Sequence, residues 1–437
     1  MKTLLYCLLM IPALWAVCSC SAAGDEATTN TLEELKQLRL RMDALEKKIA
    51  EDKQGPPVMT LGRAGSAYMN VSFDILFNAG WSSTPDAKEI EPGCHDPSQR
   101  GFSIRNAELA LDGAVDPYFK AFADVVFMTD FEDTTDLELE EAYALTTSLP
   151  YGLQIKPGRF FVEFGRQNTQ HPHSWDFVDQ PLVLNRMFGE DGLRQNGMRL
   201  SWLVPTPNYT EIMLGMFNGQ GGDAYSFRYL GEDDEEGFRR MYGHATTSRS
   251  IKGMGDFLYV PRIASSFDLT DVQTLVLGAS AAVGPNDTGD DTRTLIYGLD
   301  TFWKWKSSHA EGGWPFVTWQ TEILARNFEA GADEEAGLPS ETLRDWGLYS
   351  QVQWGFMRPW SAGLRGEYVT GNNSASAEAN EERATTTRVS PNVTWYPSEF
   401  SKIRLQYNHD WREYAQNADA VWLQLEFMLG AHAAHKF

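Results

Sequence analysis

The sequence predicts an all-β fold, a transmembrane antiparallel β-barrel of about 16 strands preceded by a short N-terminal coiled-coil helix. Three observations support this prediction. From about residue 66 onward, apolar and polar residues alternate, which is the pattern of strands with one apolar and one polar face. The connections between these segments alternate between long and short, as in membrane-spanning barrels. After residue 23, no stretch has about 18 consecutive apolar residues, so no transmembrane helix is expected.

Residues 1–23 have the features of a secretory signal. Lys2 provides the positive start, residues 4–17 the apolar centre, and residues 21–23 a small-residue cleavage site. The alternatives are a membrane anchor, for which the apolar run is too short, and a lipoprotein signal at Cys20. Three of the four cysteines lie in this segment, so only Cys94 remains and no intrachain disulfide is expected.

Residues 24–57 read as a periplasmic leader with a short helix. Apolar residues at heptad spacing predict a coiled coil, which becomes stable if three chains already lie side by side in a homotrimer. The alternative is a lone amphipathic helix, and residues 55–57 (Gly-Pro-Pro) end it in either case. The heptad positions are Leu35, Leu38, Met42, Leu45 and Ile49.

The barrel is expected to occupy residues 58–437. An even strand number places both ends of the barrel on the periplasmic side. The 307–313 connection is longer than a tight turn, the alternation is blurred around 138–143, and its phase shifts near 157–158, which indicates a bulge. The predicted strands are 66–79, 101–113, 117–129, 136–148, 151–164, 196–204, 208–218, 257–269, 272–284, 293–306, 314–326, 344–357, 360–371, 384–397, 401–412 and 420–437.

The last predicted strand alternates from Val421 to its end at Phe437. A terminal strand is a free edge unless it pairs with the first strand and closes the barrel, so 66–79 is its expected partner. A terminal Phe resembles the signal read by the barrel assembly machinery. The chain is therefore predicted to lie in the outer membrane of a Gram-negative-type bacterium, in contact with outer-membrane lipid.

Charge and motifs exclude several function classes. The formal net charge of −23 makes nucleic acid an improbable partner. The acidic run at 231–237 reads as a solvated loop tip. No Gly-x-Ser-x-Gly motif or convincing Cys/His arrangement is found, so no enzymatic activity is expected. An energised receptor normally needs a folded plug, for which residues 24–65 are too short.

The third long connection, about 165–195, contains the main candidate residues. Its apolar residues, among them Phe177, Leu182 and Phe188, predict an ordered loop that folds inward and narrows the pore. The candidate pore-lining or constriction residues, taken from this loop and from inward strand positions, are Arg159, Arg166, His171, His173, Asp176, Arg186, Lys304, Lys306, Arg365, Arg388 and Arg404.

Two stretches resemble a known family. Residues 155–160 (Ile-Lys-Pro-Gly-Arg-Phe), the loop after them and Gly192-Leu193 resemble the phosphate-selective porin O and P family. His171-Pro172-His173 and the chain end 432–437 are similar to barrels described as zinc-regulated outer-membrane receptors. The resemblance implies an anion-selecting ladder of Arg and Lys. Acidic inward residues oppose this: Arg365 with Glu367, and Arg404 with Asp410, are expected to pair across the wall.

His171 and His173 are the candidate metal ligands, helped by Asp176 or Asp179, because imidazole suits zinc. His432 and His435 are an odd number apart on a strand and should point to opposite faces. No cofactor is expected, and zinc enters only as a possible transported ion. The predicted function is a porin for passive diffusion of small hydrophilic solutes or ions. The alternatives are a channel or receptor for a divalent metal such as zinc, and a phosphate-selective channel.

Overall fold

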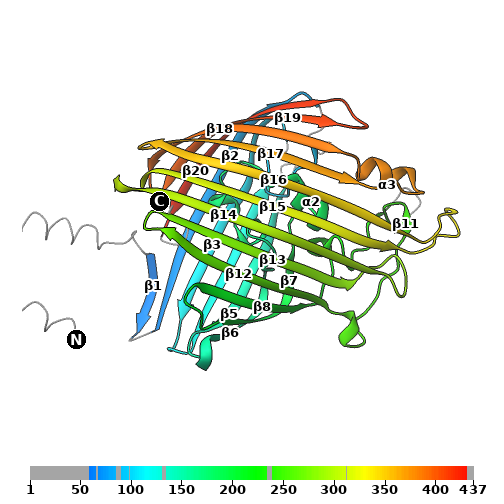
Figure 1. Ribbon diagram of the computed structural model, residues 1–437, viewed down its shortest axis with the longest axis horizontal. Coiled ribbons are helices and arrows are strands. Elements are labelled where there is room, and N and C mark those ends of the chain that lie inside the picture. Colours follow the sequence, from blue (N-terminus) through cyan, green and yellow to red (C-terminus); the bar gives the residue numbers. More distant parts are fainter. Residues whose placement is uncertain are drawn as a thin grey trace, which may run out of the picture. The chain divides into compact units, whose positions relative to one another are not determined.

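The computed structural model describes residues 59–64, 67–84, 90–97, 99–129, 134–233, 239–311 and 313–430. The predicted signal, the coiled coil, Phe437 and the His432/His435 pair lie outside these residues. Sixteen antiparallel strands form a closed ring, as predicted (Figure 1). Each predicted segment overlaps one strand of the ring, with differences at the ends, and residues 431–437 of the last predicted strand lie outside the described residues.

The ring strands differ in length but follow one another in sequence order around the barrel. They are β2 (Ala67–Ser82), β3 (Gly101–Ala114), β4 (Phe119–Thr129), β5 (Thr135–Thr146), β6 (Leu153–Phe161), β7 (Arg194–Leu203), β8 (Tyr209–Phe217), β12 (Leu258–Thr270), β13 (Gln273–Pro285), β14 (Arg293–Glu311), β15 (Trp314–Ala330), β16 (Glu341–Met357), β17 (Trp360–Gly371), β18 (Thr386–Ser398), β19 (Ser401–Arg412) and β20 (Ala418–Leu429).

Short elements accompany the ring. A strand that the sequence pattern did not reveal, β1 (Met59–Ala64), pairs with β2. A small sheet of β9 (Glu232–Asp233), β10 (Arg239–Met241) and β11 (His244–Ala245) lies in the connection between β8 and β12. The helical elements are η2 (Pro150–Gly152), η3 (Gln167–Thr169), η4 (Pro172–Ser174), α2 (Leu182–Phe188), η5 (Gly222–Ala224), η6 (Met254–Asp256) and α3 (Ala377–Glu382). Among the described helices, none is long and apolar enough to cross a membrane.

The barrel closes where β20 pairs with β2. The register runs from Phe73 opposite Leu429 to Ser82 opposite Ala420, which confirms the predicted partner of the last strand. Along β20, Trp422, Gln424 and Glu426 are buried, whereas Phe427 is 60% exposed. Closure removes the free edge, so every ring strand has two neighbours.

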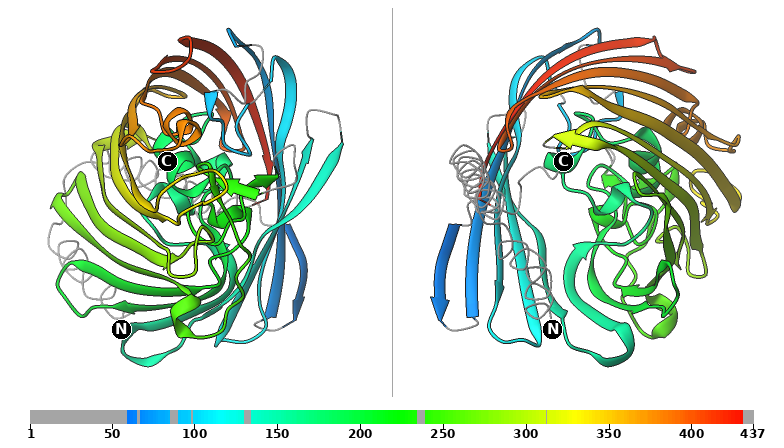
Figure 2. Two further views of the ribbon diagram at one scale, coloured as in Figure 1. Left: turned by 90° about the vertical axis from the view of Figure 1, so that its right-hand side faces the viewer. Right: turned by 60° about the vertical axis from the view of Figure 1, so that its left-hand side comes forward.

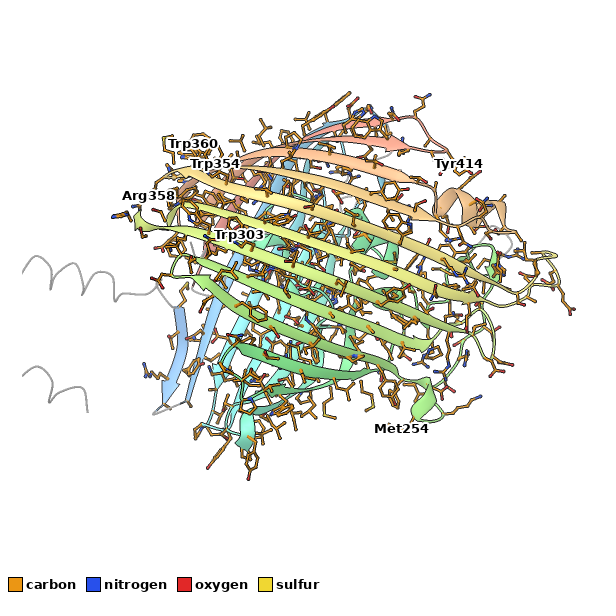
Figure 3. All side chains as sticks on the ribbon, in the orientation of Figure 1. Met254, Trp303, Trp354, Arg358, Trp360 and Tyr414 are labelled. Carbon is orange, nitrogen blue, oxygen red and sulfur yellow. The ribbon has the colours of Figure 1, made fainter. Side chains whose placement is uncertain are left out.

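The outer face of the ring is apolar and its ends carry aromatic residues. Trp303, Trp354 and Trp360 lie near Arg358 at the short-turn end, and Tyr414 lies at the opposite end with Met254 (Figure 3). Exposed Leu, Ile, Val and Phe residues occupy the strands between these ends. An apolar belt between aromatic girdles matches the hydrocarbon layer and interfaces of a bilayer.

Two local predictions were wrong. The 307–313 connection is shorter than expected, because β14 continues to Glu311, which pairs with Trp314 after a register shift beyond Lys306. Polar residues at 307–309 hide this extension, since a strand that projects beyond the lipid needs no apolar face. The bulge predicted near 157–158 is absent, and the register of β6 with β7 is uninterrupted.

The blurred alternation in β5 comes from a bulge of its own. Asp124 of β4 pairs with Glu141 and the next residue, Val125, with Leu139, so Glu140 is the extra residue. A bulge changes which way side chains point. As a result, Glu140 and Glu141 are both buried inside the barrel.

Candidate functional site in the barrel lumen

The third loop, residues 162–193 between β6 and β7, folds into the lumen. Figure 2 shows this green segment inside the ring of strands. Its helix α2 buries Val183, Leu184 and Met187 in one hydrophobic cluster with Leu324 and Tyr349 of the wall. The inward fold of this loop was predicted from its apolar residues, and the cluster explains it. Burying that apolar surface favours the inward position.

A wall carboxylate holds the beginning of the third loop. Glu322 Oε1 accepts hydrogen bonds from the backbone N–H of Arg166 at 3.2 Å and of Gln167 at 2.7 Å, and from Tyr349 Oη at 2.6 Å. Gly165 has a φ of 61°, and a Cβ there would lie 2.0 Å from Glu322 Oε2. Only glycine allows so close an approach of the loop to the wall.

Wall side chains also satisfy the backbone further along the loop. Glu367 Oε2 accepts the N–H of Leu182 at 2.7 Å, and Gln406 Oε1 accepts the N–H of Val178 at 2.9 Å. Lys402 Nζ donates to the carbonyl of His173 at 2.5 Å. Buried backbone groups need such partners, so the loop is fixed along its length.

On one side of the lumen, a basic wall surrounds Asp179 of the loop. Its carboxylate lies 2.5 Å from Arg365 Nη2 and 3.5 Å from Arg388 Nη1. Arg365 also pairs with Glu367 at 2.7 Å, as predicted. The predicted pair of Arg404 with Asp410 is wrong. Arg404 and Asp410 lie six positions apart on β19, about 20 Å along the strand. Asp410 is opposite Arg388 of β18 and pairs with it at 2.6 Å, whereas Arg404 donates to the Trp175 carbonyl.

On the other side, strands β2 to β5 form an acidic wall against the two loop histidines. The rings of His171 and His173 are stacked 5.6 Å apart. The predicted helpers Asp176 and Asp179 do not join them, since Asp179 is turned toward the basic wall. The carboxylates around the two rings come instead from the wall: Asp74, Glu108, Asp124, Glu140 and Glu141.

His171 occupies the centre of this acidic wall. Its Nδ1 lies 3.0 Å from Glu140, 3.3 Å from Asp124 and 3.6 Å from Glu108, and its Nε2 lies 3.0 Å from Glu141. Burial alone would lower the pKa of His171, but Glu108 and Glu140 raise it well above its ordinary value. The imidazole is therefore held by negative charge on every polar side.

His173 and a third histidine extend the cluster. His173 Nδ1 lies 3.1 Å from Glu108 and 3.8 Å from Asp74. His95, which follows β2 in the first long connection, lies 3.3 Å from Glu140. Sequence reasoning missed His95, Glu108, Glu140 and Glu141 as site residues. The available signal for Glu108 was its inward position on β3, opposite Asp74.

The remaining predicted pore-lining residues lie in separate parts of the barrel. Arg166 stacks on Phe302 at 3.8 Å, and half-buried Lys304, Lys306 and Asp176 belong to the same part of the lumen. Arg159 bonds to the Leu139 carbonyl at 3.0 Å and pairs with Asp223 and Glu138, and Arg186 of α2 pairs with Glu91 at 2.9 Å.

A cavity of about 550 Å³ opens among the long connections. Carboxylates dominate its charged lining, with Arg186 as a single guanidinium. The lining residues are Glu91, Pro92, Asn185, Arg186, Gly189, Glu190, Asp191, Gly222, Tyr225, Tyr229, Glu381 and Glu382.

A closed strand ring with an apolar belt outside and charged groups inside is suited to lipid and defines an outer-membrane β-barrel. The chain is 33% identical over 357 residues to an uncharacterized protein of Aquifex aeolicus (strain VF5), covering 78% of this chain and 71% of that protein. It belongs to the same family as that protein. No family model matches the chain.

Solved outer-membrane proteins have similar architecture at low identity. OmpT of Vibrio cholerae, in its trimer form, has 6% identity and a TM-score of 0.49, covering 83% of this chain and 100% of that one. Salmonella typhi OmpF, solved in complex with daunomycin, has 11% identity and a TM-score of 0.49, covering 85% and 100%. OprB of Pseudomonas putida has 10% identity and a TM-score of 0.46, covering 83% and 94%.

Proposed function

We propose that this barrel is a porin, a non-enzymatic channel through which small hydrophilic solutes and ions diffuse passively across the outer membrane. The observation that carries the proposal is the third loop fixed inside a charged lumen by Glu322, Glu367 and Gln406. A loop held this way narrows a pore without covering it from outside. Charged walls in such a pore select solutes by size and sign.

The charge arrangement favours cations at the outer mouth. The cavity among the long connections carries Glu91, Glu190, Asp191, Glu381 and Glu382. Negative charge in a concave mouth raises the local concentration of cations. A phosphate-selecting ladder has less support, because Arg365, Arg388 and Lys402 each pair with a carboxylate.

Planar lipid bilayers test the proposal directly. Folded protein should give discrete conductance steps, and the steps should occur in threes if the barrel is a trimer, as the predicted coiled coil suggests. Reversal potentials in asymmetric KCl should indicate a preference for K⁺. Heat-denatured protein in the same detergent is the control. Folded protein that inserts without conducting would contradict the channel.

A further inference from the structure

We propose that Glu108, Asp124, Glu140 and His171 bind a divalent transition-metal ion that links the third loop to strands β3, β4 and β5. His171 belongs to the loop, and the three carboxylates belong to one strand each. The inference goes beyond channel function and does not depend on it, because it concerns how the loop is held.

The spacing of the donor atoms fits a coordination shell. One ligand atom from each residue lies within 4.8 Å of all the others. His171 Nδ1 is 3.0, 3.3 and 3.6 Å from oxygens of Glu140, Asp124 and Glu108. Metal–donor distances of about 2.1 Å place neighbouring donors about 3.0 Å apart in an octahedral shell and about 3.4 Å apart in a tetrahedral one. The three separations measured from Nδ1, between 3.0 and 3.6 Å, cover both values.

Protons alone compensate the negative charge of this cluster poorly. A single N–H on Nδ1 of His171 can point at one carboxylate, yet three surround that nitrogen. Asp124 is 0% exposed, and within the described part of the chain neither of its oxygens accepts a hydrogen bond. A buried carboxylate without such partners is costly unless a cation is close to it.

The second ring nitrogen of His171 has the partner that a metal-binding imidazole requires. Nε2 lies 3.0 Å from Glu141 Oε2, and Glu141 Oε1 accepts the backbone N–H of Phe161 at 3.0 Å. Donating Nε2–H to a carboxylate leaves the Nδ1 lone pair available for the ion and fixes the orientation of the ring. The β5 bulge is what brings Glu140 and Glu141 to the two nitrogens of one ring.

The ligand set indicates the class of ion. Calcium and magnesium take shells of oxygen ligands, whereas an imidazole favours zinc, iron, nickel or copper. One imidazole with three carboxylates therefore selects a first-row transition dication over calcium. Two positive charges also offset most of the three negative charges on Glu108, Asp124 and Glu140.

Zinc is the probe for the test. Folded, chelator-treated protein in detergent should bind a single Zn²⁺ per chain in calorimetry and elemental analysis, with Ca²⁺ binding far more weakly. Co²⁺ in its place should give a visible d–d absorption band. Asp124→Asn keeps the shape of the side chain and should abolish tight binding. Glu141→Gln should weaken zinc binding by about 10- to 100-fold, because it acts only through His171.

The matched control is His409→Ala. His409 lies 2.7 Å from Asp419 and outside the cluster, so its removal should leave zinc binding unchanged. Heat-modifiable migration confirms that each variant is folded. Wild-type protein that binds no Zn²⁺, or Asp124→Asn and His171→Ala proteins that bind it as tightly as wild type, would overturn the site. Conductance of the same chelated sample tests the channel separately from the ion site. A sample that conducts but does not bind zinc overturns the ion site alone. A sample that binds zinc but does not conduct overturns the channel alone.

Discussion

Glu140 and Glu141 point to the same side of β5, although neighbouring residues of a strand normally point to opposite faces. The cause is the bulge at Glu140, where Asp124 pairs with Glu141 and Val125 with Leu139. Both carboxylates then reach His171, each at 3.0 Å and each at a different ring nitrogen. One inserted residue therefore doubles the negative charge that the wall presents to this imidazole.

The contact of Glu322 with the third loop should control pore width. Glu322→Ala removes one acceptor from Arg166 N–H, Gln167 N–H and Tyr349 Oη, and an intramolecular hydrogen bond contributes about 0.5–1.5 kcal/mol. We expect the loop to leave its position and the single-channel conductance to rise. The control is Glu329→Ala, on the same strand as Glu322. It removes an exposed acceptor of the Arg293 N–H. Equal conductance in both variants would contradict the contact's role.

Asp179 should set the charge that the basic wall shows to the lumen. Its carboxylate compensates the positive charge of Arg365 and Arg388, so Asp179→Asn leaves more positive charge where the third loop lies against this wall. Reversal potentials in asymmetric KCl should shift toward anions. Asp419→Asn, an exposed carboxylate beside His409, serves for comparison. An unshifted potential in the Asp179 variant would show that permeating ions do not pass this wall.

The packing of the first long connection against the third loop should weaken as pH rises. Burial and then the nearby Asp179 raise the pKa of Asp96 from 3.8 to about 7, and Asp96 Oδ1 accepts the Gln180 N–H at 3.0 Å. Because the folded pKa is raised, the stabilising contribution is complete below pH 3.8 and is lost as pH rises through about 7.

Hydrogen exchange over residues 177–182 measures this dependence. After correction for intrinsic exchange, the opening constant should increase by up to about tenfold per pH unit across that window, since a single proton is released. Asp96→Asn cannot ionise, so its profile should be flat. If Asp96→Asn protein shows the same pH dependence of the opening constant as wild type, another titrating group causes it.

Charge on the lipid face should destabilise the barrel. Leu299 is 64% exposed in the middle of β14, opposite Ala279 and Ile323. Arginine near the bilayer midplane costs about 2–4 kcal/mol, so Leu299→Arg should lower the free energy of unfolding in lipid vesicles by that amount. Tyr414→Arg, at a position 63% exposed among the connections, should change it little. Similar losses at both positions would contradict the assignment of the belt.

The ring strands were predictable because lipid requires an apolar residue at every second position along them. The alternation stopped being informative where that requirement ends, as at 307–309 and in β1, whose six residues are all exposed. The inward third loop was predictable from apolar residues such as Leu182 and Phe188. Its charged partners were not, because they depend on the bulge in β5 and on the strand register, which sets Arg388 directly opposite Asp410. His171 was predicted to be a metal ligand, but the carboxylates that surround it are distant from it in sequence.

The third loop also constrains the order in which the barrel can assemble. Its contacts reach residues far ahead in the chain: Arg186 to Arg326 spans 140 positions, and His173 to Lys402 spans 229. These residues belong to β15 and β19, so the loop cannot take its final position until those strands have formed. Contacts of such high sequence separation form slowly. We therefore expect insertion of the loop and closure of the β2–β20 seam to be a single late step of folding.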